Sequence, residues 1–130
     1  RLEGLTKLYG AEILISEDTL NQLTNRNHHH YRFLDRVQVK GKKASISVFE
    51  IYDSESPDRI ELKNKTLANF EMAIAAYKEG NFETSQTLFQ QIVTLNPSDR
   101  AALLYLQRCE KYIQQGVPQD WAGIEAMTEK

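Results

Sequence analysis

Residues 31–52, YRFLDRVQVKGKKASISVFEIY, carry the clearest structural signal in the chain. Apolar and polar side chains largely alternate in segments 31–40 and 44–52, and a glycine and two lysines at 41–43 connect the two. Alternation with a period of two is typical of a strand with one packed face, and a short polar connection with glycine favours a hairpin. The sequence therefore predicts an antiparallel β-hairpin. The side chains expected on its packed face are Tyr31, Phe33, Val37, Val39, Ala44, Ile46 and Val48.

The residues before the hairpin predict two short helices around one strand. Residues 1–10 place a leucine at every third position and end at a glycine, as expected of a helix and its stop signal. Residues 11–15 form a short, mostly apolar run, which predicts a strand buried on both faces. Ser16 is a suitable N-cap for a second helix, because Glu17 and Asp18 then lie near the positive end of the helix dipole.

The first helix starts abruptly, since neither an initiator methionine nor a capping residue precedes Arg1. Three strands and two helices also bury too little apolar surface to be more than marginally stable alone. We therefore expect a further segment of the same domain to precede Arg1.

Near residue 55 the hydrophobic period changes from two to between three and four. Residues 53–59, DSESPDR, predict a linker that ends in a helix start, with Ser56 as the cap, Pro57 at the first helical position and Asp58 complementing the dipole.

Three apolar stripes at helical spacing follow this linker. The breaks between them fall at residues 80–81 and 96–97, Ser98 is expected to cap the third helix, and Gly116 to end it. The sequence predicts a helical hairpin with a further helix packed on it. The stripe residues are Phe70, Ala73, Ile74 and Tyr77; Phe82, Ser85, Phe89 and Ile92; and Ala102, Tyr105, Leu106, Cys109, Tyr112 and Ile113.

Residues 76–99, AYKEGNFETSQTLFQQIVTLNPSD, resemble one tetratricopeptide repeat. Ser85 stands where the repeat normally has alanine, and Asn69 and Met72 stand at its early tryptophan and leucine positions, so the copy is degenerate. One repeat cannot bury its own face, which the third helix, the first half of the chain or another subunit must cover. The residues at characteristic positions of the repeat are Tyr77, Gly80, Phe82, Phe89 and Pro97.

The C-terminal residues 117–130 place Trp121, Ile124 and Met127 at helical spacing, which predicts a last short helix. Trp121 is either an anchor for a partner or an aromatic side chain that folds back on its own domain. The candidate interaction residues of the helical half are Tyr77, Phe82, Phe89 and Trp121.

Composition excludes several classes of protein. With 130 residues and a formal net charge of -2, the chain has no overall basic field for nucleic acid or an anionic membrane surface. No apolar run approaches the roughly 20 residues that a membrane span needs, so an anchor would lie elsewhere in a parent protein. A single cysteine, Cys109, allows no disulfide within the chain and favours a reducing, cytoplasmic compartment.

Two motifs with potential chemistry have ordinary explanations. Asn27 and the three histidines at 28–30 lack a cysteine or a nearby acidic pair to complete a metal shell, so a variable loop is the favoured interpretation. Cys109 lies on the inner stripe of the third helix, where a buried thiol is usual.

Residues 1–53 resemble the end of the catalytic domain of class III adenylate and guanylate cyclases. The most specific parts of the resemblance are the opening helix and Val39-Lys40-Gly41-Lys42. This family has an Asn-x-x-x-Arg signature at a helix start, and Arg1-Leu2-Glu3 looks like its second half.

The resemblance implies a transition-state role for Arg1 and triphosphate binding by Lys40, while Lys42 and Lys43 remain surface charge. In this family ATP or GTP is converted to the cyclic nucleotide by dimers whose active sites draw residues from both chains. Two aspartates there hold two Mg or Mn ions and belong to the part before Arg1. The resemblance thus implies that this chain alone is inactive and supplies no metal ligand.

We therefore expect an α+β chain in three parts: 1–53, the C-terminal part of a cyclase domain; 54–59, a linker and helix start; and 60–130, a tetratricopeptide-like helical module. The parent is expected to be an adenylate cyclase, with guanylate cyclase second, acting as a homodimer, and its helical module is expected to bind a protein partner. The alternative is a non-catalytic helical scaffold with a relic cyclase segment. Carboxylates and an asparagine upstream of Arg1 would distinguish the two.

Overall fold

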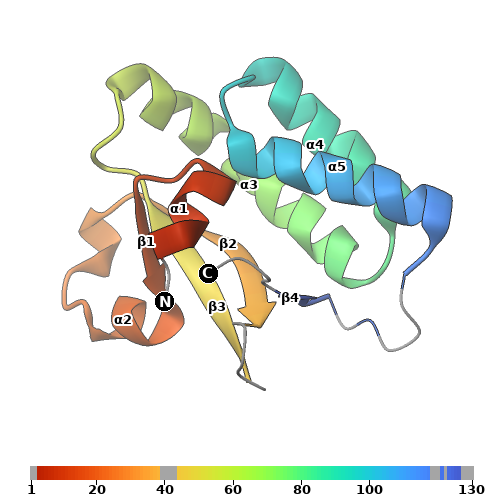
Figure 1. The fold of residues 1–130 in the computed structure, drawn as a ribbon. Coiled ribbons are helices and arrows are strands. Elements are labelled where there is room, and N and C mark those ends of the chain that lie inside the picture. The colour runs from red at the N-terminus through yellow and green to blue at the C-terminus, as the bar shows by residue number, and fades with distance from the viewer. Residues whose placement is uncertain (1–2, 39–43, 118–120, 122, 127–130) are drawn as a thin grey trace. The chain divides into compact units, whose positions relative to one another are not determined.

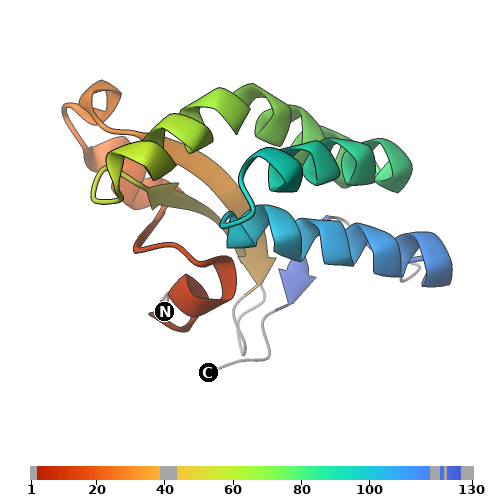
Figure 2. The ribbon, with the colours of Figure 1, turned by 90° about the horizontal axis from the view of Figure 1, so that it is seen from above.

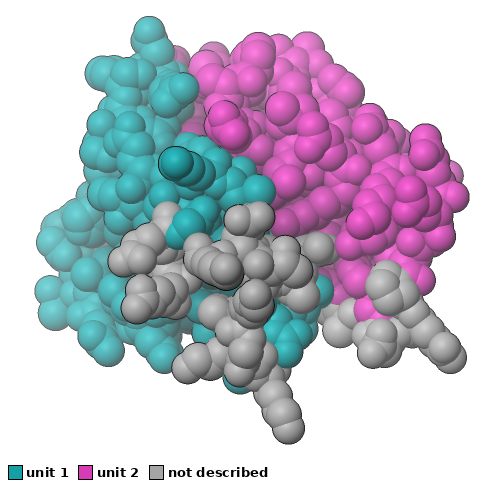
Figure 3. Space-filling view, viewed as in Figure 1, with its two compact units in different colours: residues 1–60, 124–130 teal, residues 61–123 magenta. Residues whose placement is uncertain are grey.

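The computed structural model describes residues 3–38, 44–117, 121 and 123–126. The chain divides into two compact units (Figure 3). Unit 1 consists of Arg1–Ile60 and Ile124–Lys130, and unit 2 of Glu61–Gly123. Among the described helices, none has the length and apolar character needed to cross a membrane.

Unit 1 is built around one sheet, whose four strands in the described residues run in the order β1-β3-β2-β4 (Figure 1). The pairs β1·β3 and β2·β3 are antiparallel, whereas β4 pairs with β2 in parallel. The α+β class and the antiparallel hairpin are thereby confirmed. The elements of this unit are α1 (Glu3–Tyr9), β1 (Ile13–Ser16), α2 (Glu17–Gln22), the 3-10 helix η1 (Arg26–His28), β2 (Tyr31–Gln38), β3 (Ser45–Ile51) and β4 (Glu125–Ala126).

The two short helices of unit 1 follow their sequence signals. Gly10 ends α1 with a φ of 66°, a left-handed conformation that glycine adopts without steric cost. The Ser16 hydroxyl accepts a hydrogen bond from the Thr19 backbone N–H at 3.2 Å, as predicted for the N-cap of α2. Leu20 is the buried side chain of this helix.

The strand β1 corrects one prediction. A strand buried on both faces was expected, but β1 lies at the edge of the sheet and pairs with β3 alone within the described residues. Ile13 is 40% exposed in consequence. An apolar run of this length does not distinguish an edge strand from a central one, because both contain the same residue types.

A β-bulge divides the hairpin into two parts. Phe33 lies opposite Phe49, but the next pair along β2 is Asp35 opposite Val48, so Leu34 is an extra residue. An extra residue shifts the alternation of all side chains beyond it to the other face.

The bulge makes part of the predicted packed face wrong. Arg32 and Leu34 are buried, whereas Tyr31 and Phe33 are half-buried and pack their rings on Phe49, with centroids 6.3 and 5.6 Å away. The prediction is confirmed for Val37 and Val48, which are fully buried. Of the remaining predicted packed-face residues, Ile46 is half-buried, Ala44 is exposed and Val39 lies outside the described residues.

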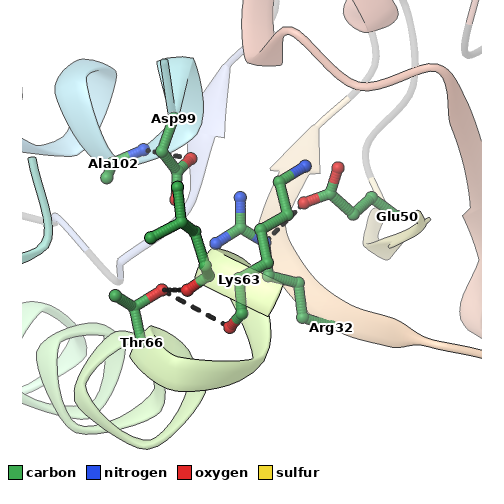
Figure 4. A network of polar contacts seen from close by, with 7 residues as sticks. Arg32, Glu50, Lys63, Thr66, Asp99 and Ala102 are labelled. Carbon is green, nitrogen blue, oxygen red and sulfur yellow. Dashed lines mark hydrogen bonds and ion pairs between the residues drawn. The ribbon is translucent and has the colours of Figure 1, made fainter. Parts of the chain in front are cut away.

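Unit 2 takes its fold from three helices (Figure 2). They are α3 (Pro57–Lys78), which begins in the last residues of unit 1, α4 (Phe82–Leu95) and α5 (Arg100–Gln115). Gly80 at φ 82° ends α3, and the Asn81 side chain caps α4. Asp99, not the predicted Ser98, caps α5, because its carboxylate accepts from the Ala102 N–H at 3.2 Å (Figure 4).

Side chains of the three predicted apolar stripes pack against one another in the core of unit 2. Phe70 of α3 contacts Phe89 of α4 edge to face, and Tyr105 of α5 stacks on Phe89 with ring centroids 4.9 Å apart. The third helix therefore covers the hairpin, one of the possibilities left open by the sequence. Ser85 is fully buried, and its hydroxyl donates to the Ala73 carbonyl at 2.9 Å. Ile113 departs from the prediction, since it is 39% exposed.

Residues 123–126, the part of the C-terminal segment that the structure describes continuously, do not form the predicted helix. Glu125 and Ala126 form β4, which pairs with Val37 and Gln38 of β2. Gly123 has a φ of 78°, a conformation that a right-handed helix excludes. Met127 lies outside the described residues.

The Phe89→Ala substitution tests the core of unit 2. Phe89 is fully buried, so its truncation is expected to lower the free energy of unfolding by about 3–5 kcal/mol. Leu95→Ala is the matched control on the same helix, because Leu95 is 58% exposed, and it is expected to cost no more than about 0.5 kcal/mol. Urea unfolding followed by circular dichroism measures both. Equal losses would contradict this account of the core.

Candidate functional site

The two residues with an expected catalytic role, Arg1 and Lys40, lie outside the described residues, as do Lys42 and Lys43. The elements that carry them are described. Arg1 precedes α1 by one residue, and Lys40 follows β2 by one residue. The candidate site is therefore built from what fixes α1 and the hairpin within unit 1.

A buried hydrogen bond joins these two elements. The Tyr9 hydroxyl, in the last turn of α1, donates to Asp35 Oδ2 of β2 at 2.5 Å. Both residues are almost completely buried, with 2% and 1% exposure. The backbone N–H of Arg36 donates to the other carboxylate oxygen of Asp35 at 2.8 Å. A carboxylate held at both oxygens fixes the end of α1 against the middle of β2.

Sequence reasoning missed this pair. A charged residue within a mostly apolar strand was the available signal, since a buried carboxylate requires hydrogen-bond donors. Alternation places Asp35 on the same face as Val37, and Asp35 is indeed buried, but the sequence pattern does not identify Tyr9 as its donor.

A second buried pair crosses the hairpin. Arg32 of β2 and Glu50 of β3 lie directly opposite each other, and Arg32 Nε donates to Glu50 Oε1 (Figure 4). Their side chains are each 1% exposed. Burial raises the pKa of the nearby Tyr52 hydroxyl, and the charge of Glu50 adds to this rise while that of Arg32 opposes it. The raised pKa keeps the Tyr52 hydroxyl protonated beside the pair at neutral pH.

His29 and His30 make contacts at the end of the hairpin where β2 begins and β3 ends. His29 Nδ1 lies 2.7 Å from Asp53 Oδ2, and the His30 backbone N–H donates to Asp53 Oδ1 at 2.8 Å. The Tyr52 N–H donates to the His30 carbonyl at 2.9 Å. These contacts tie the residue after β3 to the residues before β2. Within the described residues, no group of three or more His, Cys, Asp or Glu side chains is arranged to hold a metal ion.

Asp53 is stabilised in its charged form. Partial burial acts to raise its pKa, but the hydrogen bonds from His30 and His29 and the positive charge that these rings can carry outweigh it. The pKa of Asp53 therefore lies below its ordinary value of 3.8.

A polar hollow lies near the end of the hairpin where β2 ends and β3 begins. Arg36 Nε donates to Ser45 Oγ there at 2.8 Å. The hollow contains one guanidinium against two carboxylates, so it offers no excess of positive charge to a phosphate group. Its lining residues are Ser16, Glu17, Asp18, Arg36, Ser45, Ile46 and Ser47.

The candidate interaction residues of unit 2 fall into two places. Tyr77, Phe82 and Trp121 contact one another, with ring centroids between 5.3 and 5.6 Å apart. Phe89 instead lies fully buried in the core. Cys109 is buried as expected, and burial raises the pKa of its thiol, although a hydrogen bond with Ser85 opposes the rise. A raised pKa makes this thiol a poor nucleophile.

The Tyr9→Phe substitution tests the link between α1 and β2. Removal of a hydroxyl that donates to a buried carboxylate is expected to lower the free energy of unfolding by about 1.5–3 kcal/mol. Tyr31→Phe is the control, because Tyr31 is half-buried and its hydroxyl has no hydrogen-bond partner in the described parts of the chain. Chemical denaturation measures both, and a Tyr9→Phe protein as stable as the control would argue against a role for the bond.

The lowered pKa of Asp53 predicts a pH dependence. Its contribution to stability is complete above 3.8, the ordinary pKa, and disappears as the pH falls through the lower pKa of the folded state. Asp53→Asn is thus expected to be less stable than the unmodified chain at pH 7, with the difference shrinking below pH 3.8. Urea unfolding across this pH range measures the difference, with Glu71→Gln on the exposed side of α3 as control. A difference of equal size at both ends of the range would contradict the prediction.

Comparison with known proteins gives two relatives of this chain. It is 33% identical over 115 residues, 88% of its length, to the terminal-differentiation specific adenylate cyclase of Dictyostelium discoideum, of which the match covers 5%. It is 44% identical over 52 residues, 39% of its length, to an adenylate cyclase of Anabaena cylindrica, of which the match covers 10%. The chain matches no protein-family model and no solved structure.

The chain thus spans only 5% and 10% of the length of these relatives. The match of 115 residues to the Dictyostelium protein is longer than residues 1–53, so it extends into the helical half. This chain therefore contains a segment related to proteins named adenylate cyclase.

Proposed function

We propose that residues 1–53 are the C-terminal part of a class III nucleotide cyclase domain, whose intact protein converts ATP, or less readily GTP, to the cyclic 3',5'-nucleotide and pyrophosphate. The observation that carries this proposal is the identity to two proteins named adenylate cyclase, one of which extends over 88% of the chain. The hairpin expected at the end of such a domain is present in unit 1.

Arg1 is proposed to stabilise the transition state. The ribose 3'-hydroxyl attacks the α-phosphorus, a new P–O bond closes the ring, the bond to the β-phosphate oxygen breaks, and the hydroxyl proton is lost. Negative charge builds on the phosphoryl oxygens during this step. A guanidinium suits that charge because it remains protonated and presents a planar set of donors. The Tyr9–Asp35 bond supports this role, since it fixes the helix that follows Arg1.

Lys40 is proposed to bind the triphosphate. A compact ammonium group at the end of a strand is a suitable phosphate ligand. The Arg32–Glu50 pair and the contacts of Asp53 hold the hairpin that carries it.

The metal ions of the reaction, two Mg or Mn, are proposed to be held by residues outside this chain. Arg1 and Lys40 would therefore act on a triphosphate bound to aspartates of another chain, in a homodimer formed through the cyclase domain. On this proposal the chain alone makes no cyclic nucleotide.

Residues 60–130 are proposed to be a tetratricopeptide-like module that binds a protein partner. Ser85 supports this assignment despite standing at an alanine position, because its buried hydroxyl is satisfied by the Ala73 carbonyl. Tyr105 supports it as well, since it covers the aromatic face of the helical hairpin.

A protein extended upstream through the catalytic region tests the cyclase proposal. It is expected to convert ATP to cyclic AMP in the presence of Mg or Mn, measured by chromatography of the product. Arg1→Ala is expected to lower kcat by about 100-fold or more, as the loss of one transition-state donor does. Lys40→Ala is expected to raise KM mainly, because it removes a contact made in the ground state as well.

Lys43→Ala is the matched control, since Lys43 is proposed to be surface charge, and its kinetic constants are expected to stay unchanged. An extended protein that is folded and dimeric but forms no cyclic product would refute the enzyme proposal. The helical module would then be the functional centre, as in the scaffold alternative. Activity that survives Arg1→Ala would refute the role of Arg1 alone.

A further inference from the structure

The hairpin of unit 1 is supported unevenly along its length. Residues 48–51 of β3 lie between two strands, because they pair with both β1 and β2. Residues 45–47 of β3 pair with β2 alone among the described residues. This less supported end is the one where residues 39–43 connect the two strands in the sequence. The position of the start of β3 therefore depends on what joins it to β2.

A side-chain hydrogen bond joins the two strands at this end. Arg36 Nε of β2 donates to Ser45 Oγ of β3 at 2.8 Å. The two residues are diagonal neighbours, since Gln38 is the residue opposite Ser45. Diagonal neighbours in an antiparallel pair lie within reach of a long side chain. The bond thus ties the first residue of β3 to a residue two positions before the end of β2.

Arg36 is itself well anchored in unit 1. Its backbone N–H donates to Asp35 Oδ1 at 2.8 Å, and the other oxygen of that carboxylate accepts from the buried Tyr9 hydroxyl of α1. The next residue, Val37, is fully buried and pairs with β4 as well as with β3. The guanidinium therefore extends to Ser45 from a part of β2 that is held on several sides.

The surroundings of Arg36 do not suit a phosphate ligand. Its side chain lines the polar hollow together with Glu17 and Asp18, so two carboxylates oppose one guanidinium there. Surroundings with a net negative charge disfavour a triphosphate. The guanidinium is therefore better suited to hold Ser45 than to contact the substrate.

We propose that Arg36 is a positioning residue for Lys40, because it holds Ser45 and so fixes the two ends between which the connection 39–43 runs. This inference rests on the proposed function, since it takes Lys40 to be the triphosphate ligand. Lys40 lies two positions after the end of β2 and five positions before Ser45. Fixing the ends of a short connection reduces the entropy that is lost when a residue within it binds a ligand.

Kinetics of the protein extended upstream through the catalytic region test the proposal. Ser45→Ala removes the hydroxyl that accepts from Arg36, and it is expected to raise KM for ATP by about two- to tenfold with kcat unchanged. Arg36→Ala is expected to raise KM by the same factor. The double variant is expected to show no further rise, because both substitutions remove one and the same bond. A merely structural role would instead lower the folded fraction, and with it kcat, at an unchanged KM.

Two further variants serve as rescue and control. Ser45→Thr retains the hydroxyl and suits a strand, so its KM is expected to return to that of the unmodified protein. Lys7→Ala removes an exposed positive charge from the last turn of α1, and its KM is expected to stay unchanged. A rise in KM for Lys7→Ala equal to that for Arg36→Ala would mean that overall charge, and not the bond to Ser45, is responsible, and would overturn the proposal.

Lys40→Ala separates this inference from the proposed function. If Lys40→Ala raises KM but Ser45→Ala does not, Arg36 has no positioning role, and the proposed function is unaffected. If the extended protein forms no cyclic nucleotide, or if Lys40→Ala leaves KM unchanged, the proposed role of Lys40 is wrong and this inference fails with it.

Amide hydrogen exchange of the chain itself, followed by NMR, tests the structural step without any activity. Arg36→Ala is expected to speed exchange of the amides of residues 45–47 by at least about twofold, because local opening of this end becomes easier. The amides of Phe49 and Glu50, which lie between two strands, are expected to exchange at unchanged rates. Unchanged exchange at 45–47 in a folded Arg36→Ala chain would overturn the proposal.

Discussion

The hairpin of unit 1 depends on the buried contact between Arg32 and Glu50, and the bulge at Leu34 makes that contact possible. Near the tip, Val37 lies opposite Ile46. If this register continued without interruption, Arg32 would face Ile51 and leave its charge buried against an apolar side chain. The extra residue moves Arg32 opposite Glu50 instead. An unpaired buried charge is strongly unfavourable, so the ion pair disfavours every register but the bulged one.

The same bulge marks how far the fold of unit 1 could be predicted from the sequence. The antiparallel hairpin, a strand near residues 11–15 and the Ser16 cap follow from local signals, and these predictions are confirmed. Strand alternation assigned Tyr31 and Phe33 to the packed face, the face opposite to that of Arg32. That assignment holds only for an unbroken register. The partner that permits Arg32 to be buried lies 18 positions along the chain, beyond the reach of any local pattern.

The candidate site, too, could be predicted only in part. Arg1 and Lys40 were predicted from resemblance to a family, which identifies residue types at fixed spacing. The Tyr9–Asp35 bond was not predicted, because it joins residues 26 positions apart whose sequence neighbourhoods contain no signal for each other. Yet this bond fixes α1 to β2, the two elements that lead to the candidate residues. Motifs indicate which groups do chemistry, whereas tertiary contacts of this kind determine where those groups are held.

The C-terminal segment shows why a spacing of three residues is weak evidence. Three apolar residues at positions 121, 124 and 127 satisfy a helical pattern, but a single turn cannot form where Gly123 adopts a left-handed conformation. Tertiary contacts determine the structure of the described residues in this segment. Trp121 packs on aromatic rings. The strand β4, which begins four residues later, pairs with Val37 and Gln38 of β2. Those residues end the described part of β2, just before Lys40. The spacing of three residues thus carried no information on the pairing that residues 125 and 126 adopt.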